Sequence, residues 1–320
     1  MKKIMILALA LTVLFSAPSC KRRPLSDADY NVNVVFNIDQ NILNGPEMTE
    51  PEMMRVAFFD HNNGNLVAQA YLPPQGGQVS VLPGRSYDVL AYNFGTQVTF
   101  IQNENNFGRI SATTNQIADS FKSKLKSRGT RSPGDETEET IVYDPDHLFV
   151  GRLMNVDMPA RSVESPEVTL TIDCQTVVQS WILCVNKIKG AQYVGSISAV
   201  ITGLSQYHRL GPGNRSEEVA SVFFDVRNLD RDGFLDARFN TFGSSPKRGE
   251  RQILSLVITD VAGKGYIFNV DISDQFIDNP RQYIIVNTDD IEIPEPEHKE
   301  GGGLAPSVDE WKDINTNINI

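Results

Sequence analysis

The stretch NVNVVFNI, residues 31–38, decides the fold class of this chain, because every second residue is apolar and the residues between them, except Val35, are Asn. One face of such a strand collects its apolar side chains, Val32, Val34, Phe36 and Ile38. Residues 265–272, GYIFNVDI, repeat the alternation. A period of two residues is typical of a strand with one buried face. Both stretches therefore predict β-strands.

The same reading extends over most of the chain. Further strands are predicted at 54–60, 65–71, 78–82, 86–94, 140–143, 147–154, 167–174, 176–188, 195–202, 219–227, 234–241 and 252–260. Turn signals such as Asn62-Asn63-Gly64 separate them. Helix is expected only at 114–126 and as a single turn at 273–277. Many short strands at regular spacing predict an all-β protein of sandwich architecture with little helix.

A polar stretch bracketed by proline, MPARSVESP at 158–166, suggests a boundary between two domains. We expect an N-terminal β-sandwich over 20–158, a linker over 159–166 and a C-terminal β-sandwich over 167–293. Residues 294–320 form an acidic, glycine-containing tail.

The first 19 residues have the pattern of a secretory signal peptide, with two lysines, an apolar run and small residues. Cys20 then follows Ser19, as in a bacterial lipobox, although Ala17 and Pro18 depart from the usual pattern. The sequence therefore predicts a mature chain that is acylated on Cys20 and held on a membrane without crossing it. Ordinary secretion with cleavage just before Cys20 is the alternative.

The formal net charge of −11 disfavours nucleic acid as a partner, and no basic stripe with interleaved aromatic residues opposes it. Motifs of known enzyme classes are absent: there is no HExxH, no GxSxG, no Walker loop and no GxGxxG after a strand. The histidines are scattered at 61, 147, 208 and 298. We therefore predict neither enzymatic activity nor a cofactor.

Cys174 and Cys184 fall on predicted inward positions of successive strands. A disulfide across a hairpin and two buried free thiols are both compatible with this spacing.

One segment has the spacing of a calcium loop. Oxygen-bearing side chains stand at positions 1, 3, 5 and 9, namely Asn228, Asp230, Asp232 and Asp236, with Gly233 at position 6. Position 12 is Phe239 where such loops carry a bidentate glutamate. Asp and Gly are also frequent in ordinary turns, so a hairpin turn is the favoured prediction and a calcium site the alternative.

The last residues, 314–320, alternate between Ile or Thr and Asn after the glycines at 301–303. Such a strand either returns to its own sheet or adds to the open edge of a neighbouring subunit. In the second case Ile314, Ile318 and Ile320 would be the apolar anchors of a donor strand.

These features together resemble the fimbrillin-like lipoproteins of type V pili, which include fimbrial anchor subunits. The resemblance rests on the signal, on FFDHNNGNLV (58–67), LPGRSYDVLAYNFGT (82–96), VTLTIDCQTVVQSWILCV (168–185) and GSISAVITGLS (195–205), and on the tail at 301–320. It implies two consecutive transthyretin-like β-sandwich domains of Greek-key topology that assemble by strand exchange. It brings no catalytic residues with it.

In this family, polymerising subunits lose their first strand to an arginine-specific protease, which opens a groove for a strand of the next subunit. Here no Lys or Arg lies between Arg23 and Arg55, so residues 31–38 have no cleavage site that would sever them from the next strand. We therefore expect the groove to stay filled, which favours an anchor or capping subunit over a stalk subunit.

The expected function is that of a non-enzymatic subunit of the outer membrane that anchors or caps a fimbria at the cell surface. Its expected partners are other fimbrillin-like subunits and, through acylated Cys20, outer-membrane lipid. The alternative is a surface lipoprotein that binds a glycan or a host ligand on the same scaffold. A tryptophan platform for sugars has little support, since the chain has only Trp181, in a predicted buried run, and Trp311.

Overall fold

The computed structural model describes residues 29–45, 51–118, 139–160, 167–287, 290–296 and 316–318. Within these ranges the helical elements are two short 3-10 turns, η2 (Ala191–Tyr193) and η3 (Ser273–Phe276), and the remaining regular structure is β-strand. The all-β fold class is therefore confirmed, and the helical turn expected at 273–277 is present. None of the helical elements in these ranges has the length and apolar character needed to cross a membrane.

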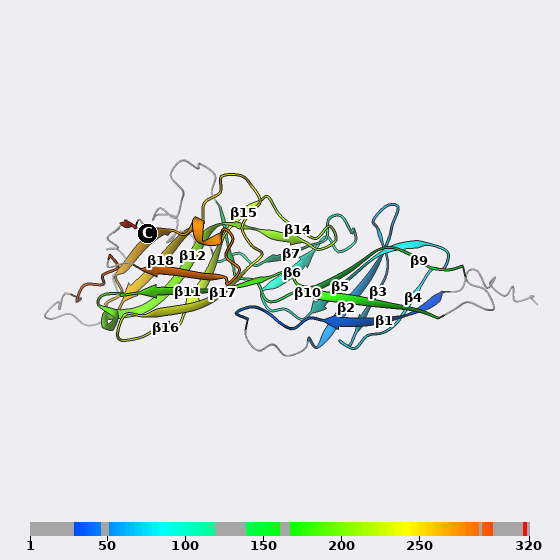
Figure 1. Cartoon of the computed structure of the whole chain (residues 1–320), viewed down its shortest axis with the longest axis horizontal. Coiled ribbons are helices and arrows are strands. Elements are labelled where there is room, and N and C mark those ends of the chain that lie inside the picture. Colours follow the sequence, from blue (N-terminus) through cyan, green and yellow to red (C-terminus); the bar gives the residue numbers. More distant parts are fainter. Residues whose placement is uncertain are drawn as a thin grey trace, which may run out of the picture.

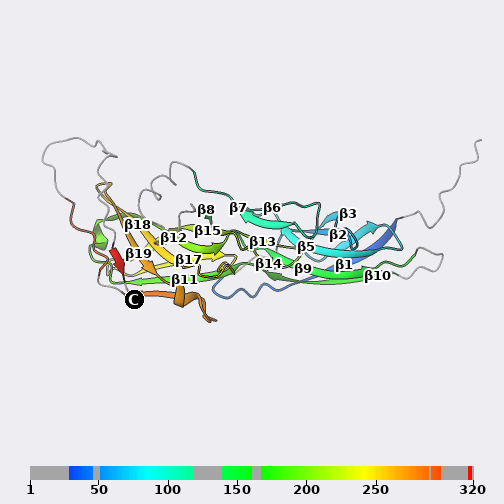
Figure 2. The ribbon, with the colours of Figure 1, turned by 90° about the horizontal axis from the view of Figure 1, so that it is seen from above.

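The strands form two bodies that follow one another along the long axis of an elongated molecule (Figure 1, Figure 2). The N-terminal body contains a seven-stranded sheet, and the C-terminal body contains a four-stranded and a six-stranded sheet. A second four-stranded sheet lies where the two bodies meet (Figure 1).

The N-terminal sheet has the strand order β3-β2-β5-β9-β10-β1-β4. Its strands are β1 (Tyr30–Ile38), β2 (Met53–Asp60), β3 (Leu66–Leu72), β4 (Gly77–Val81), β5 (Ser86–Phe94), β9 (Phe149–Asp157) and β10 (Val168–Thr176). Strands β9 and β10 pair through only two residue pairs, Val150 with Gln175 and Phe149 with Thr176. The sheet therefore separates there into two layers, which enclose one apolar core.

Strands β2 and β5 are buried on both faces, which explains their nearly continuous runs of apolar residues. Val56 and Phe58 face the core of the N-terminal body, whereas Ala57 and Phe59 face a second core. A strand with two covered faces has no solvent side that requires polar residues.

The sheet that covers this second face combines strands from both halves of the chain. Its order is β14-β13-β7-β6, with β6 (Thr99–Gln102), β7 (Ser111–Thr114), β13 (Tyr207–Arg209) and β14 (Asn214–Arg215). Strand β7 pairs antiparallel with β13, and Leu210 and Phe242 pack into the same core as Phe59. The helix expected to begin at Thr114 is not found at its start, because Thr114 is the last residue of β7; residues 119–126 lie outside the described ranges.

The C-terminal body is a sandwich of two sheets around the largest core. One sheet has the order β16-β17-β11-β20, with β11 (Gln179–Asn186), β16 (Asn228–Leu229), β17 (Leu235–Thr241) and β20 (Tyr283–Asn287). The other has the order β21-β19-β18-β12-β15-β8, with β8 (Thr140–Tyr143), β12 (Val194–Ser205), β15 (Val219–Val226), β18 (Ile253–Asp260), β19 (Gly265–Asp271) and β21 (Thr316–Ile318).

The division between the bodies differs from the predicted boundary at 159–166. Strand β10, which follows that segment, belongs to the N-terminal sheet, where it pairs with β1 and β9. Strand β8, which precedes it, pairs with β15 in the C-terminal body. After β10 the chain passes from the N-terminal to the C-terminal body between Thr176 and Gln179, through Val177 and Val178. These two valines belong to the core where the bodies meet, so the connection lacks the polar residues from which a domain boundary would be predicted.

Candidate functional site

The first strand, β1, is held on both of its edges. It pairs in parallel with β10 from Val32 to Ile38 and antiparallel with β4 from Tyr30 to Val34. Four of its side chains, Tyr30, Val32, Val34 and Phe36, are buried in the N-terminal core. The place that β1 occupies in the sheet is therefore filled by the chain itself.

The basic residue that follows β1 in the sequence, Arg55, is inaccessible to a protease. It lies in the middle of the sheet on β2 and is only 4% exposed. Its guanidinium donates a hydrogen bond of 2.6 Å to the hydroxyl of Tyr92 and also contacts the side chains of Gln69 and Glu104. Arg23, the basic residue before β1, lies outside the described residues.

The C-terminal strand is found on its own sheet, which is one of the two arrangements that the sequence allowed. Residues 316–318 form β21, which pairs in parallel with β19, with Ile318 opposite Val270. Ile314 and Ile320, the other two predicted anchors, lie outside the described residues, as does Cys20. The pairing makes β21 an edge strand of only three residues, beside a β19 of seven residues.

The segment with calcium-like spacing forms a hairpin turn between β16 and β17. The Asp230 carboxylate accepts hydrogen bonds from the backbone amides of Asp232 and Phe234, at 2.9 and 2.8 Å. Asn228 and Asp236 lie opposite each other in the two strands. In the described part of the chain no three His, Cys, Asp or Glu side chains are grouped as metal ligands would be. Asp230 thus stabilises the turn through the backbone.

Cys174 and Cys184 are free thiols in different bodies. Cys174 is on β10, in the N-terminal core, where burial raises its pKa to about 12. Cys184 is on β11 and is half-buried, on the outward side of a strand whose inward residues are Leu183 and Val185. The inward position predicted for Cys184 is therefore wrong, because β11 alternates and is not buried throughout.

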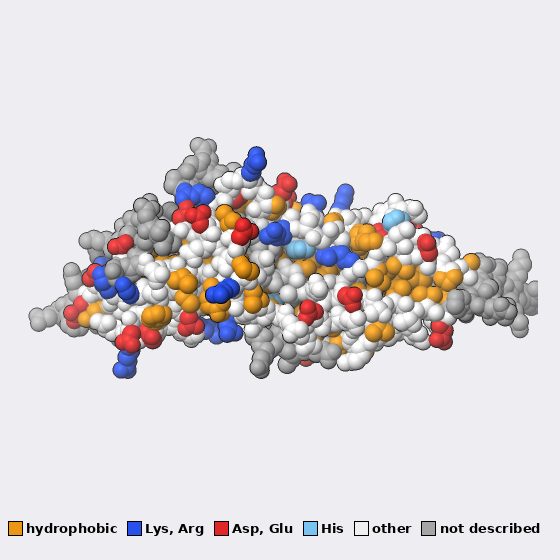
Figure 3. Space-filling view, in the orientation of Figure 1, with side chains coloured by type: hydrophobic (Ala, Val, Ile, Leu, Met, Phe, Trp, Pro, Cys, Tyr) orange, Lys and Arg blue, Asp and Glu red, His pale blue; other side chains and the backbone are white. Residues whose placement is uncertain are grey.

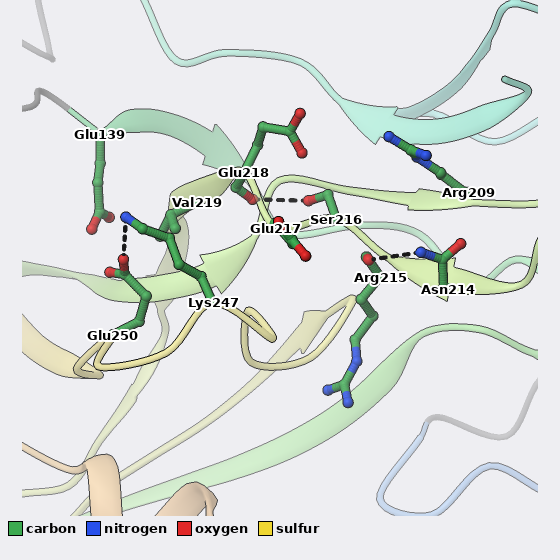
Figure 4. Close-up of a pocket in the computed structure, with 10 residues that line it drawn as sticks. All are labelled: Glu139, Arg209, Asn214, Arg215, Ser216, Glu217, Glu218, Val219, Lys247 and Glu250. Atoms are coloured by element: carbon green, nitrogen blue, oxygen red, sulfur yellow. Dashed lines mark hydrogen bonds and ion pairs between the residues drawn. The ribbon is translucent and has the colours of Figure 1, made fainter.

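Two cavities lie beside β14, where the bodies meet. One has a volume of about 670 Å³ and is lined by Glu139, Arg209, Asn214, Arg215, Ser216, Glu217, Glu218, Val219, Lys247 and Glu250 (Figure 4). The Lys247 ammonium pairs with the Glu250 carboxylate at 2.5 Å, and the Tyr207 hydroxyl donates to Glu218 at 2.8 Å. This cavity could not be predicted from the sequence, because its walls come from segments far apart in the chain.

The second cavity, of about 640 Å³, shares Asn214, Arg215 and Glu217 with the first and is also lined by His208. Burial, together with the charge of Arg152, lowers the pKa of His208 to about 4. His208 is therefore uncharged at neutral pH and too weak a base to abstract a proton from a substrate.

A second buried histidine, His147, lies close to a serine without forming a catalytic site. Its Nε2 is 3.0 Å from Ser180 Oγ, which donates to Asn240 Oδ1 at 2.7 Å. Both His147 and Ser180 are buried, and neither lines the two cavities above. A nucleophile needs access to its substrate, so this cluster serves the packing between β10, β11 and β17.

Aromatic side chains are exposed on the N-terminal body, beside the buried Arg55. Tyr71 and Phe94 are 46% and 55% exposed, and their rings make an edge contact with centroids 5.2 Å apart. Neither lines the cavities beside β14. Trp181, by contrast, is 3% exposed and packs against Phe276, as its buried run predicted.

Charged side chains of both signs are interspersed on the face shown in Figure 3, and among the described side chains of that face no stripe of Lys and Arg appears. Apolar side chains gather there mainly over the N-terminal body. This distribution does not resemble the continuous basic surface that binds nucleic acid.

Comparison with known proteins gives a consistent result. Residues 19–225 match the family model described as "Domain of unknown function (DUF5119)". The chain is 27% identical over 335 residues to "Putative fimbrium anchoring subunit Fim4B" of Bacteroides ovatus, covering 94% of this chain and 93% of the relative.

Two solved structures share the fold. A putative adhesin from Bacteroides ovatus ATCC 8483 superposes with a TM-score of 0.62 at 24% identity, covering 87% of this chain and 98% of that one. The fimbrial anchor protein Mfa2 from Porphyromonas gingivalis superposes with a TM-score of 0.50 at 13% identity, covering 81% and 89%.

These relatives are fimbrial and adhesin proteins and not enzymes, which agrees with the predicted lack of enzymatic activity and with a place at the cell surface. The resemblance to fimbrillin-like proteins is confirmed. The chain therefore belongs to the DUF5119 family.

Proposed function

We propose that this protein is a lipid-anchored subunit of the outer membrane that tethers or caps a fimbria, with its own first strand retained and strand exchange as the mode of assembly. The observation that carries the proposal is the position of β1. It lies between β10 and β4, its apolar face is buried, and no Lys or Arg lies between Arg23 and the buried Arg55. Cleavage after Arg23 would detach Cys20 but leave β1 in the sheet, so retention of β1 and retention of the lipid are separate parts of the proposal.

Membrane attachment through Cys20 is tested by fractionating cells that produce the full chain or the variant Cys20→Ala. The full chain is expected in the outer-membrane fraction with an acylated first residue, because several acyl chains make detachment negligible. The variant is expected in the soluble fraction. Mass spectrometry of native protein that shows an unmodified Cys20, or a first residue beyond Ile38, would contradict the proposal.

The tail is the proposed donor strand, which leaves β19 and adds to the sheet edge of a neighbouring subunit. Replacing Ile314, Ile318 and Ile320 by Asn removes the apolar anchors. Replacing the intervening Asn315, Asn317 and Asn319 by Ser is the matched control, because it alters the same segment on its other face. Pull-down from intact envelopes is expected to lose fimbrillin-like partners with the first variant and retain them with the second. Undiminished association in both would exclude the tail as the donor.

A second candidate, binding of a surface glycan or host ligand, is favoured by the exposed pair Tyr71 and Phe94, since sugars stack on aromatic rings. The test is a glycan-array screen of the intact protein against the variant Tyr71→Ala with Phe94→Ala. Signals that this variant abolishes would support the second candidate, whereas a protein that binds no glycan and co-purifies with fimbrial subunits would support the first.

A further inference from the structure

Strand β20 forms one edge of the four-stranded sheet of the C-terminal body. It pairs in parallel with β11, and the backbone amide of Ile182 donates to the carbonyl of Gln282 at 3.0 Å. In a parallel ladder alternate residues direct both backbone groups to the same side. Tyr283 and Ile285 therefore direct their N–H and C=O groups away from β11, toward the open side.

The open side is occupied by two amide side chains. The carboxamide of Gln275 donates through Nε2 to the carbonyl of Ile285 at 3.0 Å and accepts through Oε1 from the amide of Ile285 at 2.7 Å. Asn279 donates through Nδ2 to the carbonyl of Tyr283 at 2.7 Å. A carboxamide has the donor and acceptor of a peptide group, so Gln275 takes the place of a peptide from an adjoining strand.

These amides are held in position by the core. Gln275 lies in η3, where Phe276 packs against Trp181 with ring centroids 4.4 Å apart. Its backbone amide donates to the carbonyl of Ile272 at 2.9 Å, and its carbonyl accepts from Asn279 Nδ2 at 2.8 Å. The packing of Phe276 and the two hydrogen bonds of the Gln275 backbone thus hold Gln275 in position for its contact with Ile285.

Without these amides, β20 would have the features of an edge that pairs with another chain. Ile284 and Val286 are fully buried and fix the register, while Tyr283 and Ile285 are 40% and 45% exposed on the outer face. Ile277, which follows η3, is 66% exposed nearby. An edge with free backbone groups and apolar side chains is a template for strand addition. A second copy offers the same edge, and two such edges pair about a twofold axis.

We propose that Gln275 and Asn279 form a side-chain cap that closes the β20 edge against a second copy of this chain. The cap satisfies both outward backbone groups of Ile285 and the outward carbonyl of Tyr283, so a second β20 finds these three groups already paired. Self-association through the C-terminal body is thereby suppressed, and strand addition is confined to other edges. This inference does not depend on the proposed role in a fimbria.

The test uses the full chain after residue 20, with Gln275→Met and Asn279→Ala together. Methionine keeps the length of glutamine but cannot form the two hydrogen bonds. Light scattering after gel filtration, over a series of concentrations, is expected to show a monomer for the parent and a dimer for the variant. The apparent dimer dissociation constant should fall by at least roughly tenfold. Gln97→Met, at an exposed glutamine in the loop before β6, is the control and should remain monomeric.

A further change identifies the edge. Ile285→Pro in the uncapped variant removes the outward N–H, and proline is tolerated where an edge strand faces solvent. The triple variant is expected to be a monomer by light scattering. Circular dichroism should confirm that its sheets are retained. The inference is overturned if the folded, uncapped variant stays monomeric over the whole concentration series. It is also overturned if the variant dimerises and Ile285→Pro leaves the dimer intact.

Discussion

Phe36 of β1 lies opposite Ile172 of β10, in a parallel register that continues from Val32 to Ile38. Both side chains are buried in the N-terminal core. The first strand of the protein is therefore bound by the strand that ends the N-terminal body, so that the beginning and the end of this body are neighbours in one sheet.

This arrangement predicts how the chain responds to a protease that cuts after basic residues. Trypsin is expected to leave residues 24–54 intact, because they contain no Lys or Arg. Gln40→Arg places a cleavage site at an exposed position just after β1. Mass spectrometry should show cleavage after residue 40 in this variant, and native gel filtration should show that the β1 fragment stays bound. Release of the fragment under native conditions would contradict the tight hold on β1.

The core between the two bodies predicts that they unfold together. Leu210 is fully buried there, and Leu210→Ala is expected to reduce the free energy of unfolding by about 2–5 kcal/mol. Calorimetry should show one transition for the parent and two for this variant, since the contact between the bodies is weakened. Leu256→Ala, within the C-terminal core, is the control: it should lower the midpoint but preserve one transition. Two transitions in the parent would show that the bodies are independent.

Asp144 predicts a pH dependence of stability. Burial, reinforced by the neighbouring Asp146 and Asp225, raises the pKa of Asp144 to about 6, from 3.8 in the unfolded chain. The folded state thus retains a proton that the unfolded state has lost, and the contribution of this group to stability falls as pH rises from about 4 to about 6.

Asp144→Asn, which is neutral at every pH, should therefore be more stable than the parent at pH 7, by about 3 kcal/mol. Near pH 4 the difference should vanish. Urea denaturation at a series of pH values measures it. Asp225→Asn, at an exposed neighbour, should have a smaller effect in the same direction. If the difference in unfolding free energy between Asp144→Asn and the parent does not change with pH, the raised pKa of Asp144 is contradicted.

The turn at Asp230 predicts a loss of stability that calcium does not influence. Asp230→Ala removes two hydrogen bonds to backbone amides and is expected to reduce the free energy of unfolding by about 1–2 kcal/mol. Thermal melts of the parent should give the same midpoint with calcium or with a chelator. If calcium raises the melting midpoint of the parent but not that of the variant, the segment binds calcium and the interpretation as a simple turn is wrong.

Alternation of apolar and polar residues is sufficient to predict most of the strands, because one face of such a strand is buried and the other is exposed to solvent. The pattern missed β20 and the short strands β6, β7, β13, β14 and β16. The spacing of Thr114, Ile117 and Phe121 suggested a helix, but Ile117 packs in a small core with Ile141, Val200 and Phe223. Contacts with segments distant in the sequence decide the structure around Ile117, and a local sequence pattern cannot predict such contacts.

The domain boundary was missed for a related reason. Proline and polar residues at 158–166 mark a connection, but it joins β9 to β10 within one body. The crossing after β10, at Val177 and Val178, is apolar because it is buried between the bodies. The cap on β20 could not be predicted either, since Gln275 and Ile285 are ten residues apart and only the turn of η3 brings them together.

The direction of β1 has a mechanical consequence. Strand β1 runs along the long axis of the molecule, from the end of the N-terminal body toward the C-terminal body (Figure 1). Tension applied to the chain ahead of Tyr30 along this axis shears β1 against β10 and β4, so that all the hydrogen bonds on both flanks share the load at once. Peeling, in which bonds break singly, would require a force across the sheet.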